Sequence, residues 1–297
     1  RIGTTCMNYY QENTHTGDRA LVLVEAAGAS RCDLVLLPET FLRDEQGKET
    51  VDRGEVEHMV AQLQALAAKH QMSVLAGIAD WEGDQRYNAG ILIGRSGERL
   101  GAYHKIHATS WDMKDGALPG NELGVFDLDF ARIGVSICFD INWPDEWRQM
   151  RERGVELVCW LSAFDGGVPL QSYAWTHKYY IVSSVMGMSA RFVDITGHIL
   201  ATTSKWSRLA MQDINFDRLL CHIDGQWDKL PAIQAHYGDA VRIQGYTEED
   251  IFTIEPTDDR LSVEQLVSEF DLEPYDAYIA RSTRAQGEAR KAGLSRS

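Results

Sequence analysis

The chain has 297 residues, with 29 Lys and Arg against 44 Asp and Glu, so its formal net charge is −15. This length suits one large domain or two small ones, and 44% hydrophobic with 25% charged residues exclude a collagen-like or largely disordered chain. An acidic chain lacks the basic footprint of nucleic-acid binders and of proteins that attach to anionic membranes, so we expect neither partner.

The N-terminal half alternates strand and helix signals. Apolar residues at helical spacing predict two helices, over 16–29, with Thr16 as N-cap, and over 55–70. Short apolar or alternating runs predict strands over 2–9, 34–37, 72–79, 88–94 and 99–105. Pro38 ends the strand over 34–37, which is fully apolar and therefore typical of a buried strand.

Residues 123–203 repeat this alternation of strands and helices. We expect helices over 143–153 and 170–179, and strands over 123–128, 131–138, 155–161, 180–186, 189–195 and 198–203. Two similar halves without a Gly/Ser/Pro-rich linker predict one α/β domain over 1–255, with two sheets packed face to face and helices outside. Residues 256–297 turn acidic, then basic and small, which indicates a C-terminal extension that is flexible or contacts a partner subunit.

Three features of the sequence indicate the cellular compartment of the protein. No apolar run approaches the roughly 18 residues of a membrane-spanning helix. The first residues show no signal-peptide pattern. The five cysteines are widely spaced, without a Cys-x-x-Cys motif. We therefore expect reduced thiols in a cytoplasmic protein.

Three residues that could carry chemistry follow predicted strands. Cys138 lies between a strand and a helix that begins near Pro144, where backbone N–H groups stabilise a thiolate or an oxyanion. Glu39 follows a buried strand, where partial desolvation makes a carboxylate a usable base. Lys105 ends a strand, where its ammonium can hold an oxyanion. Taken singly, each is better explained without catalysis: Cys138 as a buried structural cysteine, Glu39 as a solvated loop residue and Lys105 as an exposed lysine.

The three residues lie in the strings LVLLPETF, GAYHKIH and GVSICFDINWPDEWR. With these strings in this order, the chain resembles the nitrilase, or carbon–nitrogen hydrolase, superfamily from about residue 2 to residue 203. The resemblance implies a four-layer α-β-β-α sandwich. It also implies protomers that associate through their helical faces, as a homodimer or a higher homo-oligomer.

The resemblance also implies a mechanism. Glu39 would act as general base on Cys138, whose sulfur attacks an amide, carbamoyl or nitrile carbon. Lys105 and the backbone N–H of Phe139 would stabilise the tetrahedral intermediate. A thioester intermediate and its hydrolysis would follow, without a metal or an organic cofactor.

The chain departs from the family in one loop. Many members carry a second glutamate between the lysine and a Pro-Gly pair, which is Pro119-Gly120 here. The corresponding loop contains no glutamate. Asp115 is the first choice as its substitute and Asp112 the second. A turn aspartate is the alternative interpretation of both, since Asp115-Gly116 is a common turn pair.

Further side chains are candidates for the site on position alone. Trp111, Phe164 and His177 could line the substrate pocket, although loop or core packing explains the two aromatic residues at least as well and a structural role is favoured for His177. His104 and His107 form an H-x-x-H string, but residues i and i+3 of a strand face opposite sides, so we expect no shared metal.

The leading hypothesis is a thiol-dependent hydrolase that acts on a small linear amide or N-carbamoyl compound. Nitrile hydrolysis by the same three residues is an alternative. It is disfavoured because that branch usually carries Cys-Trp-Glu where this chain has Cys138-Phe139-Asp140. A catalytically silent binding scaffold is the other alternative. The intact Glu39, Lys105 and Cys138 argue against it, because a buried charge set is costly to keep without a use.

Overall fold

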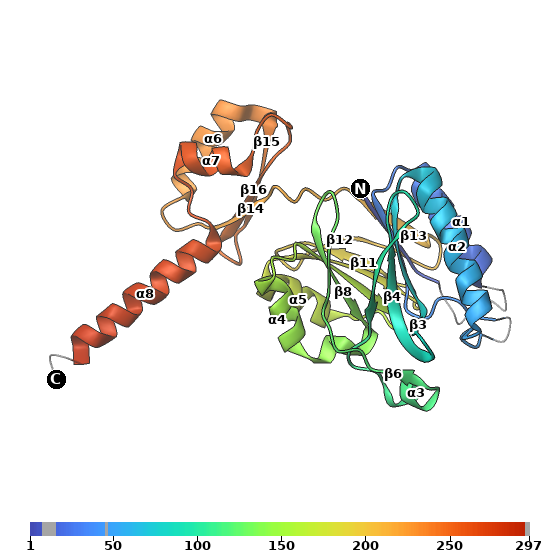
Figure 1. Ribbon diagram of the computed structural model, residues 1–297. Helices are drawn as coiled ribbons and strands as arrows, with labels where there is room; N and C mark the ends of the chain where they lie inside the picture. Colours follow the sequence, from blue (N-terminus) through green and yellow to red (C-terminus); the bar gives the residue numbers. More distant parts are fainter. Residues whose placement is uncertain (8–15, 45–46, 295–297) are drawn as a thin grey trace. The chain divides into compact units, whose positions relative to one another are not determined.

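The computed structural model describes residues 1–7, 16–44 and 47–294. The chain forms two compact units, Arg1–Ile214 and Asn215–Ser297 (Figure 1). None of the helices in the described part of the chain is long and apolar enough to cross a membrane.

The first sheet of the first unit has the strand order β13-β1-β2-β3-β4-β5, with β6 paired to β4. Its strands are β1 (Ile2–Thr5), β2 (Leu34–Leu37), β3 (Ser73–Glu82), β4 (Gln85–Ile93), β5 (Arg99–His104), β6 (Ala117–Leu118) and β13 (Leu209–Gln212). The neighbours β1, β2 and β3 are parallel, whereas β3, β4 and β5 are antiparallel. The four residues of β2 are all apolar and buried, as expected for a central parallel strand.

The second sheet has the order β12-β11-β10-β9-β8-β7. Its strands are β7 (Gly124–Asp127), β8 (Arg132–Ile137), β9 (Leu157–Ser162), β10 (Tyr180–Val185), β11 (Arg191–Val193) and β12 (Ile199–Thr202). Its central strands β8, β9 and β10 are again parallel. The two sheets therefore repeat one pattern, as the two sequence halves predict.

Helices cover the outer faces of both sheets (Figure 1). On the first sheet these are α1 (Thr16–Ala29) and α2 (Arg53–His70), and on the second α4 (Pro144–Glu152) and α5 (Val168–His177). The helices pack through buried apolar residues, such as Val24 and Leu63 on the first sheet and Trp147 and Ala174 on the second. Between the sheets, a side chain at Gly90 would crowd Val135. The predicted α-β-β-α sandwich is confirmed.

Element bounds agree closely with the prediction in most places. The predicted helix over 16–29 is α1, residue for residue. The predicted strand over 2–9 is shorter, because β1 ends at Thr5; its last two positions lie outside the described residues.

The second unit has a sheet and a core of its own. Its elements are β14 (Leu219–His222), α6 (Leu230–Tyr237), β15 (Val241–Tyr246), β16 (Ile251–Pro256), α7 (Val263–Phe270) and α8 (Tyr275–Leu294). The strands pair antiparallel in the order β14-β16-β15. Cys221, Phe252 and Leu266 are fully buried in its core.

The division of the chain at 214/215 differs from the expected one at 255/256. The strands of the second unit pair with one another, so residues 215–255 belong with the C-terminal residues. Leu266 and Leu272 are buried, so the start of the expected extension is part of a packed core. From Tyr275 to Ala292, the side chains of α8 are half-buried or exposed.

Candidate active site

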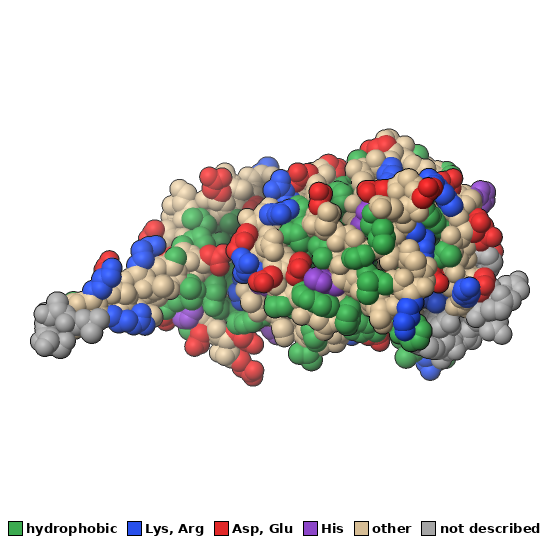
Figure 2. Space-filling view, turned by 60° about the horizontal axis from the view of Figure 1, so that its bottom comes forward, with side chains coloured by type: hydrophobic (Ala, Val, Ile, Leu, Met, Phe, Trp, Pro, Cys, Tyr) green, Lys and Arg blue, Asp and Glu red, His purple; other side chains and the backbone are tan. Residues whose placement is uncertain are grey.

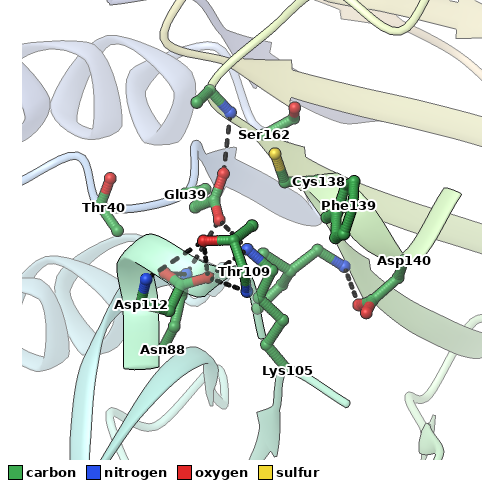
Figure 3. Close-up of polar contacts among 12 residues, drawn as sticks. Glu39, Thr40, Asn88, Lys105, Thr109, Asp112, Cys138, Phe139, Asp140 and Ser162 are labelled. Carbon is green, nitrogen blue, oxygen red and sulfur yellow. Dashed lines mark hydrogen bonds and ion pairs between the residues drawn. The ribbon is translucent and has the colours of Figure 1, made fainter. Parts of the chain in front are cut away.

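The ends of several strands bring polar groups to one place (Figure 3). Glu39 comes two residues after β2, Lys105 directly after β5, and Cys138 directly after β8. Ala163 directly follows β9, the parallel neighbour of β8. The C-terminal ends of parallel strands gather at one edge of a sheet, which is where α/β folds place their sites.

A sharp, closely packed turn positions Glu39. Thr40 has a φ of 45°, so the chain changes direction directly after the glutamate. The Arg43 guanidinium holds this turn by donating to the carbonyl and the hydroxyl of Thr40, at 3.1 and 2.9 Å. A Cβ at Gly77 would lie 2.3 Å from the carbonyl oxygen of Pro38, so only glycine allows β3 to approach this segment.

Glu39 is 4% exposed, and both of its carboxylate oxygens accept hydrogen bonds. Oε1 accepts from Nζ of Lys105 at 2.7 Å and from Nδ2 of Asn88 at 2.9 Å. Oε2 accepts from the backbone N–H of Ala163 at 3.0 Å. This carboxylate therefore has a fixed orientation between the two sheets, as a positioned base requires.

Lys105 lies between two carboxylates and is 1% exposed. Its Nζ is 2.7 Å from Oε1 of Glu39 and 3.1 Å from Oδ2 of Asp112. Burial alone would lower the pKa of Lys105, but the negative charges of Glu39, Asp112 and an ionised Cys138 outweigh it and raise the pKa above its ordinary value. The lysine is therefore a permanent cation at this site.

Cys138 opens a short 3-10 helix, Cys138–Asn142, that joins β8 to α4. Its φ of 47° is unusual for a residue with a side chain, and its carbonyl accepts from Nε1 of Trp160 at 3.2 Å. Burial and the negative charge of Glu39 raise the pKa of the Cys138 thiol to about 12, against the opposing charge of Lys105. The thiol therefore keeps its proton near neutral pH until a base removes it.

The two candidate aspartates lie in different surroundings. Asp112 is the one beside Lys105, and its Oδ1 accepts from Nδ2 of Asn88 at 3.2 Å. Asp115 instead pairs with Arg86 at 3.0 Å, and its side chain is 57% exposed. The order of preference from the sequence is therefore reversed in the structure: the second choice, Asp112, adjoins the catalytic candidates and the first choice does not.

The helix α3 (Ser110–Lys114) explains how Asp112 is held. Thr109 is its N-cap and accepts from the Asp112 N–H, while Oδ2 of Asp112 accepts from the Thr109 N–H at 2.6 Å and from its hydroxyl at 2.8 Å. Burial would raise the pKa of Asp112, but Lys105 and these donors outweigh it and hold the pKa below its usual range.

The three candidate pocket residues differ in position. Phe164 follows Ala163, is 45% exposed, and packs edge-on against Trp160 at 5.2 Å. Trp111 is 77% exposed on α3. Figure 2, which brings the bottom of Figure 1 forward, shows hydrophobic side chains at the surface of that face.

His177 ends α5, where its ring packs near Tyr173 and Tyr179 at 6.0 and 5.4 Å. The structure therefore places His177 in the helical layer rather than among the catalytic candidates.

Sequence reasoning missed two groups. Asn88 bridges Glu39 and Asp112, and it is the polar residue within the otherwise apolar end of β4. A buried polar residue in such a run is a usable signal. The Ala163 N–H carries no side-chain signal, since any residue supplies it. Only its place after a strand indicates it.

The histidines of the H-x-x-H string contact different carboxylates, His104 that of Asp80 at 2.8 Å and His107 that of Glu146 at 3.0 Å. Within the residues that the structure describes, no group of three or more His, Cys, Asp or Glu side chains could hold a metal ion.

Comparisons with known proteins show the family to which the chain belongs. A model of the carbon-nitrogen hydrolase family matches residues 2–219. The deaminated glutathione amidase of Synechocystis sp. is 26% identical over 230 residues, which are 66% of this chain and 85% of that protein. The chloroplastic omega-amidase of Arabidopsis thaliana is 26% identical over 180 residues, 55% of this chain and 49% of its own length.

Among solved structures, an amidase from Nesterenkonia sp. superposes with a TM-score of 0.63 at 19% identity. The match covers 80% of this chain and 95% of that one, which shows a shared fold. The family model spans both sheets and all the residues of the site described above. The chain therefore belongs to the carbon-nitrogen hydrolase family and is an enzyme of that class.

Proposed function

We propose that the protein hydrolyses the C–N bond of a small linear amide or N-carbamoyl compound through a thioester on Cys138. The observation that carries this proposal is the buried pair of Glu39 and Lys105, at 2.7 Å, next to a cysteine on a strained turn. A buried ion pair is a costly feature for stability alone, so its place beside a nucleophile supports a catalytic use.

In the first half of the reaction, Glu39 takes the proton of the Cys138 thiol as the sulfur attacks the carbonyl carbon. The thiol pKa of about 12 makes this transfer necessary at neutral pH. Nζ of Lys105 and the backbone N–H of Phe139 donate to the oxyanion that forms. The intermediate collapses, the C–N bond breaks, and Glu39 returns the proton to the departing ammonia or amine.

In the second half, a water molecule attacks the thioester carbon and gives a proton to Glu39. The C–S bond breaks, the acid leaves, and the proton returns to the sulfur. For an N-carbamoyl compound, the acid released is carbamic acid, which breaks down to ammonia and carbon dioxide. The cycle needs water and the side chains named here.

Asp112 has a supporting part in this proposal. It neutralises one side of Lys105 and, through Thr109, ties α3 to the site. We assign to Asp112, and not to Asp115, the place that a second glutamate has in many relatives. The shorter side chain still reaches Lys105, at 3.1 Å, because the capping of α3 brings the backbone close.

The test is paired measurement of ammonia and carbon dioxide from a panel of aliphatic amides, N-carbamoyl amines and amino acids, and nitriles. Cys138→Ala is the control. Ammonia alone from amides, lost in the variant, identifies an amidase; ammonia with carbon dioxide identifies a carbamoylase. Products from nitriles only would replace the proposal with the nitrilase alternative. No product from any compound, with Cys138 alkylated no faster than Cys221, would favour a silent scaffold.

A further inference from the structure

A second buried carboxylate, Asp140, lies two residues after Cys138 (Figure 3). It is 2% exposed and accepts three hydrogen bonds. Oδ2 accepts from the Tyr103 hydroxyl at 2.7 Å and from the Ile137 N–H at 2.8 Å. Oδ1 accepts from the His107 N–H at 2.9 Å.

These donors belong to the two segments that carry the catalytic candidates. Tyr103 and His107 stand two residues before and two residues after Lys105, and Ile137 directly precedes Cys138. The Lys105 segment continues β5 of the first sheet, whereas Ile137 ends β8 of the second. One carboxylate therefore joins two parts of the chain across the gap between the sheets. We call them the lysine segment, residues 103–107, and the cysteine turn, residues 137–142.

We propose that Asp140 is a positioning residue, whose carboxylate sets the position of Lys105 relative to the Cys138 sulfur. The inference rests on the proposed function for its catalytic consequence, but not for its geometry. Asp140 acts through the two segments and not on the substrate.

The neighbours of Asp140 hold it in one orientation. Its carbonyl accepts from the Trp143 N–H at 3.1 Å and from Nε1 of Trp147 at 3.3 Å, which fixes the turn against α4. The Tyr103 hydroxyl also accepts from the Ile106 N–H at 3.2 Å. A Cβ at Gly124 would lie 2.8 Å from Tyr103, so glycine leaves room for the ring.

An asparagine at this position cannot replace all three bonds. Oδ1 and Oδ2 of Asp140 each face a backbone N–H, that of His107 or that of Ile137. The Nδ2 group of an asparagine would meet one of these donors with a donor of its own. Asp140→Asn therefore releases either the lysine segment or the cysteine turn, while it preserves the volume of the side chain.

The experiment compares Asp140→Asn, Tyr103→Phe and the wild type by kcat, KM and the pH dependence of Cys138 alkylation by iodoacetamide. Asp127→Asn is the matched control, because Asp127 is an exposed aspartate on β7 that pairs with Arg132. For Asp140→Asn we expect kcat to fall about a hundredfold with KM nearly unchanged, since a small misplacement of reacting groups has this effect. For Tyr103→Phe, which keeps both backbone donors, we expect a smaller loss, about threefold to tenfold.

Alkylation separates positioning from a merely structural role. The charge of Lys105 lowers the pKa of Cys138, so a displaced lysine must move the midpoint of the alkylation profile to higher pH. A structural role alone would lower the melting temperature and leave this midpoint unchanged. An unmoved midpoint in folded Asp140→Asn, or a kcat within about twofold of wild type, overturns the proposal.

If circular dichroism shows that Asp140→Asn does not fold, the alkylation midpoint and kcat are measured on Tyr103→Phe instead. Asp140→Glu, which keeps the charge, is expected to retain more activity than Asp140→Asn. The alkylation measurement requires no substrate. A midpoint shift in a protein that hydrolyses none of the panel compounds would therefore support the positioning role and contradict the proposed function.

Discussion

The buried and the exposed side chains of residues 109–118 differ sharply. The Asp112 side chain contacts Lys105 and Asn88 and is 16% exposed. In contrast, Trp111 and Met113 are 77% and 52% exposed, and Asp115 pairs with Arg86 at the surface. The contrast teaches that two aspartates three residues apart have different chemistry, because burial and partners, and not spacing, determine what a carboxylate does.

We expect the largest effect from a change at Glu39, the buried carboxylate that contacts Lys105. Glu39→Gln should lower kcat by about a hundredfold to ten-thousandfold, the usual contribution of a general base. The same change should lower the pKa of Cys138 below its wild-type value of about 12, since the charge of Glu39 is one of its causes. Amide hydrolysis and the pH profile of alkylation measure the two effects. A thiol pKa that rises in Glu39→Gln would contradict the electrostatic account.

Asp112→Asn should have the next largest effect. It removes a charge-assisted contact with Lys105 and an acceptor for Thr109, a loss of about 2 kcal/mol, or roughly thirtyfold in kcat if it is felt in the transition state. Steady-state kinetics on the best amide of the panel measure this loss. An unchanged kcat would remove Asp112 from the proposed mechanism.

The buried surroundings of Asp112 can also be tested through the pH dependence of the free energy of unfolding. The pKa of Asp112 is lowered in the folded state, so its ionised form stabilises the fold above the unfolded pKa of about 3.9. This contribution is lost as the pH falls through the lower, folded pKa. The difference in free energy of unfolding between wild type and Asp112→Asn should therefore be largest at neutral pH and shrink in acid. Urea denaturation at pH 7, 5, 4 and 3 checks the trend, and a difference that grows in acid would refute it.

Asp115→Asn should have the smallest effect and serves as the matched control for Asp112→Asn. The ion pair with Arg86 is exposed on the aspartate side, so its removal should change the free energy of unfolding by less than about 1 kcal/mol. The value of kcat should stay within about twofold of wild type. A loss of activity as large as that of Asp112→Asn would show that the exposed Asp115 also serves the reaction.

Much of the fold could be predicted because both halves show clear periodicity. The end of each apolar strand identified Glu39, Lys105 and Cys138, and the structure gathers these three residues. The surroundings of the two aspartates were not predictable: the distance to a Pro-Gly pair ranks Asp115 first, but it carries no information on which carboxylate lies beside Lys105. The partners of Asn88 and of the Ala163 N–H become visible only once the strands are assembled.

The C-terminal unit was harder to predict. Its strands β14 and β15 both pair with β16, so β14 does not pair with its neighbour in sequence. Only the two end residues of β15 are buried, so its hydrophobic pattern is weak before pairing partners are known. The second core, around Phe252 and Leu266, was therefore not separated from the first.

The three catalytic candidates come from both sheets of the sandwich. Glu39 and Lys105 follow strands of one sheet, and Cys138 follows a strand of the other. A slip between the sheets by a single residue step, about 3.3 Å, would carry the sulfur out of reach of its base, even if the strand pairing within each sheet stayed intact. Turnover therefore measures the alignment of the two sheets, a property that secondary-structure content does not report.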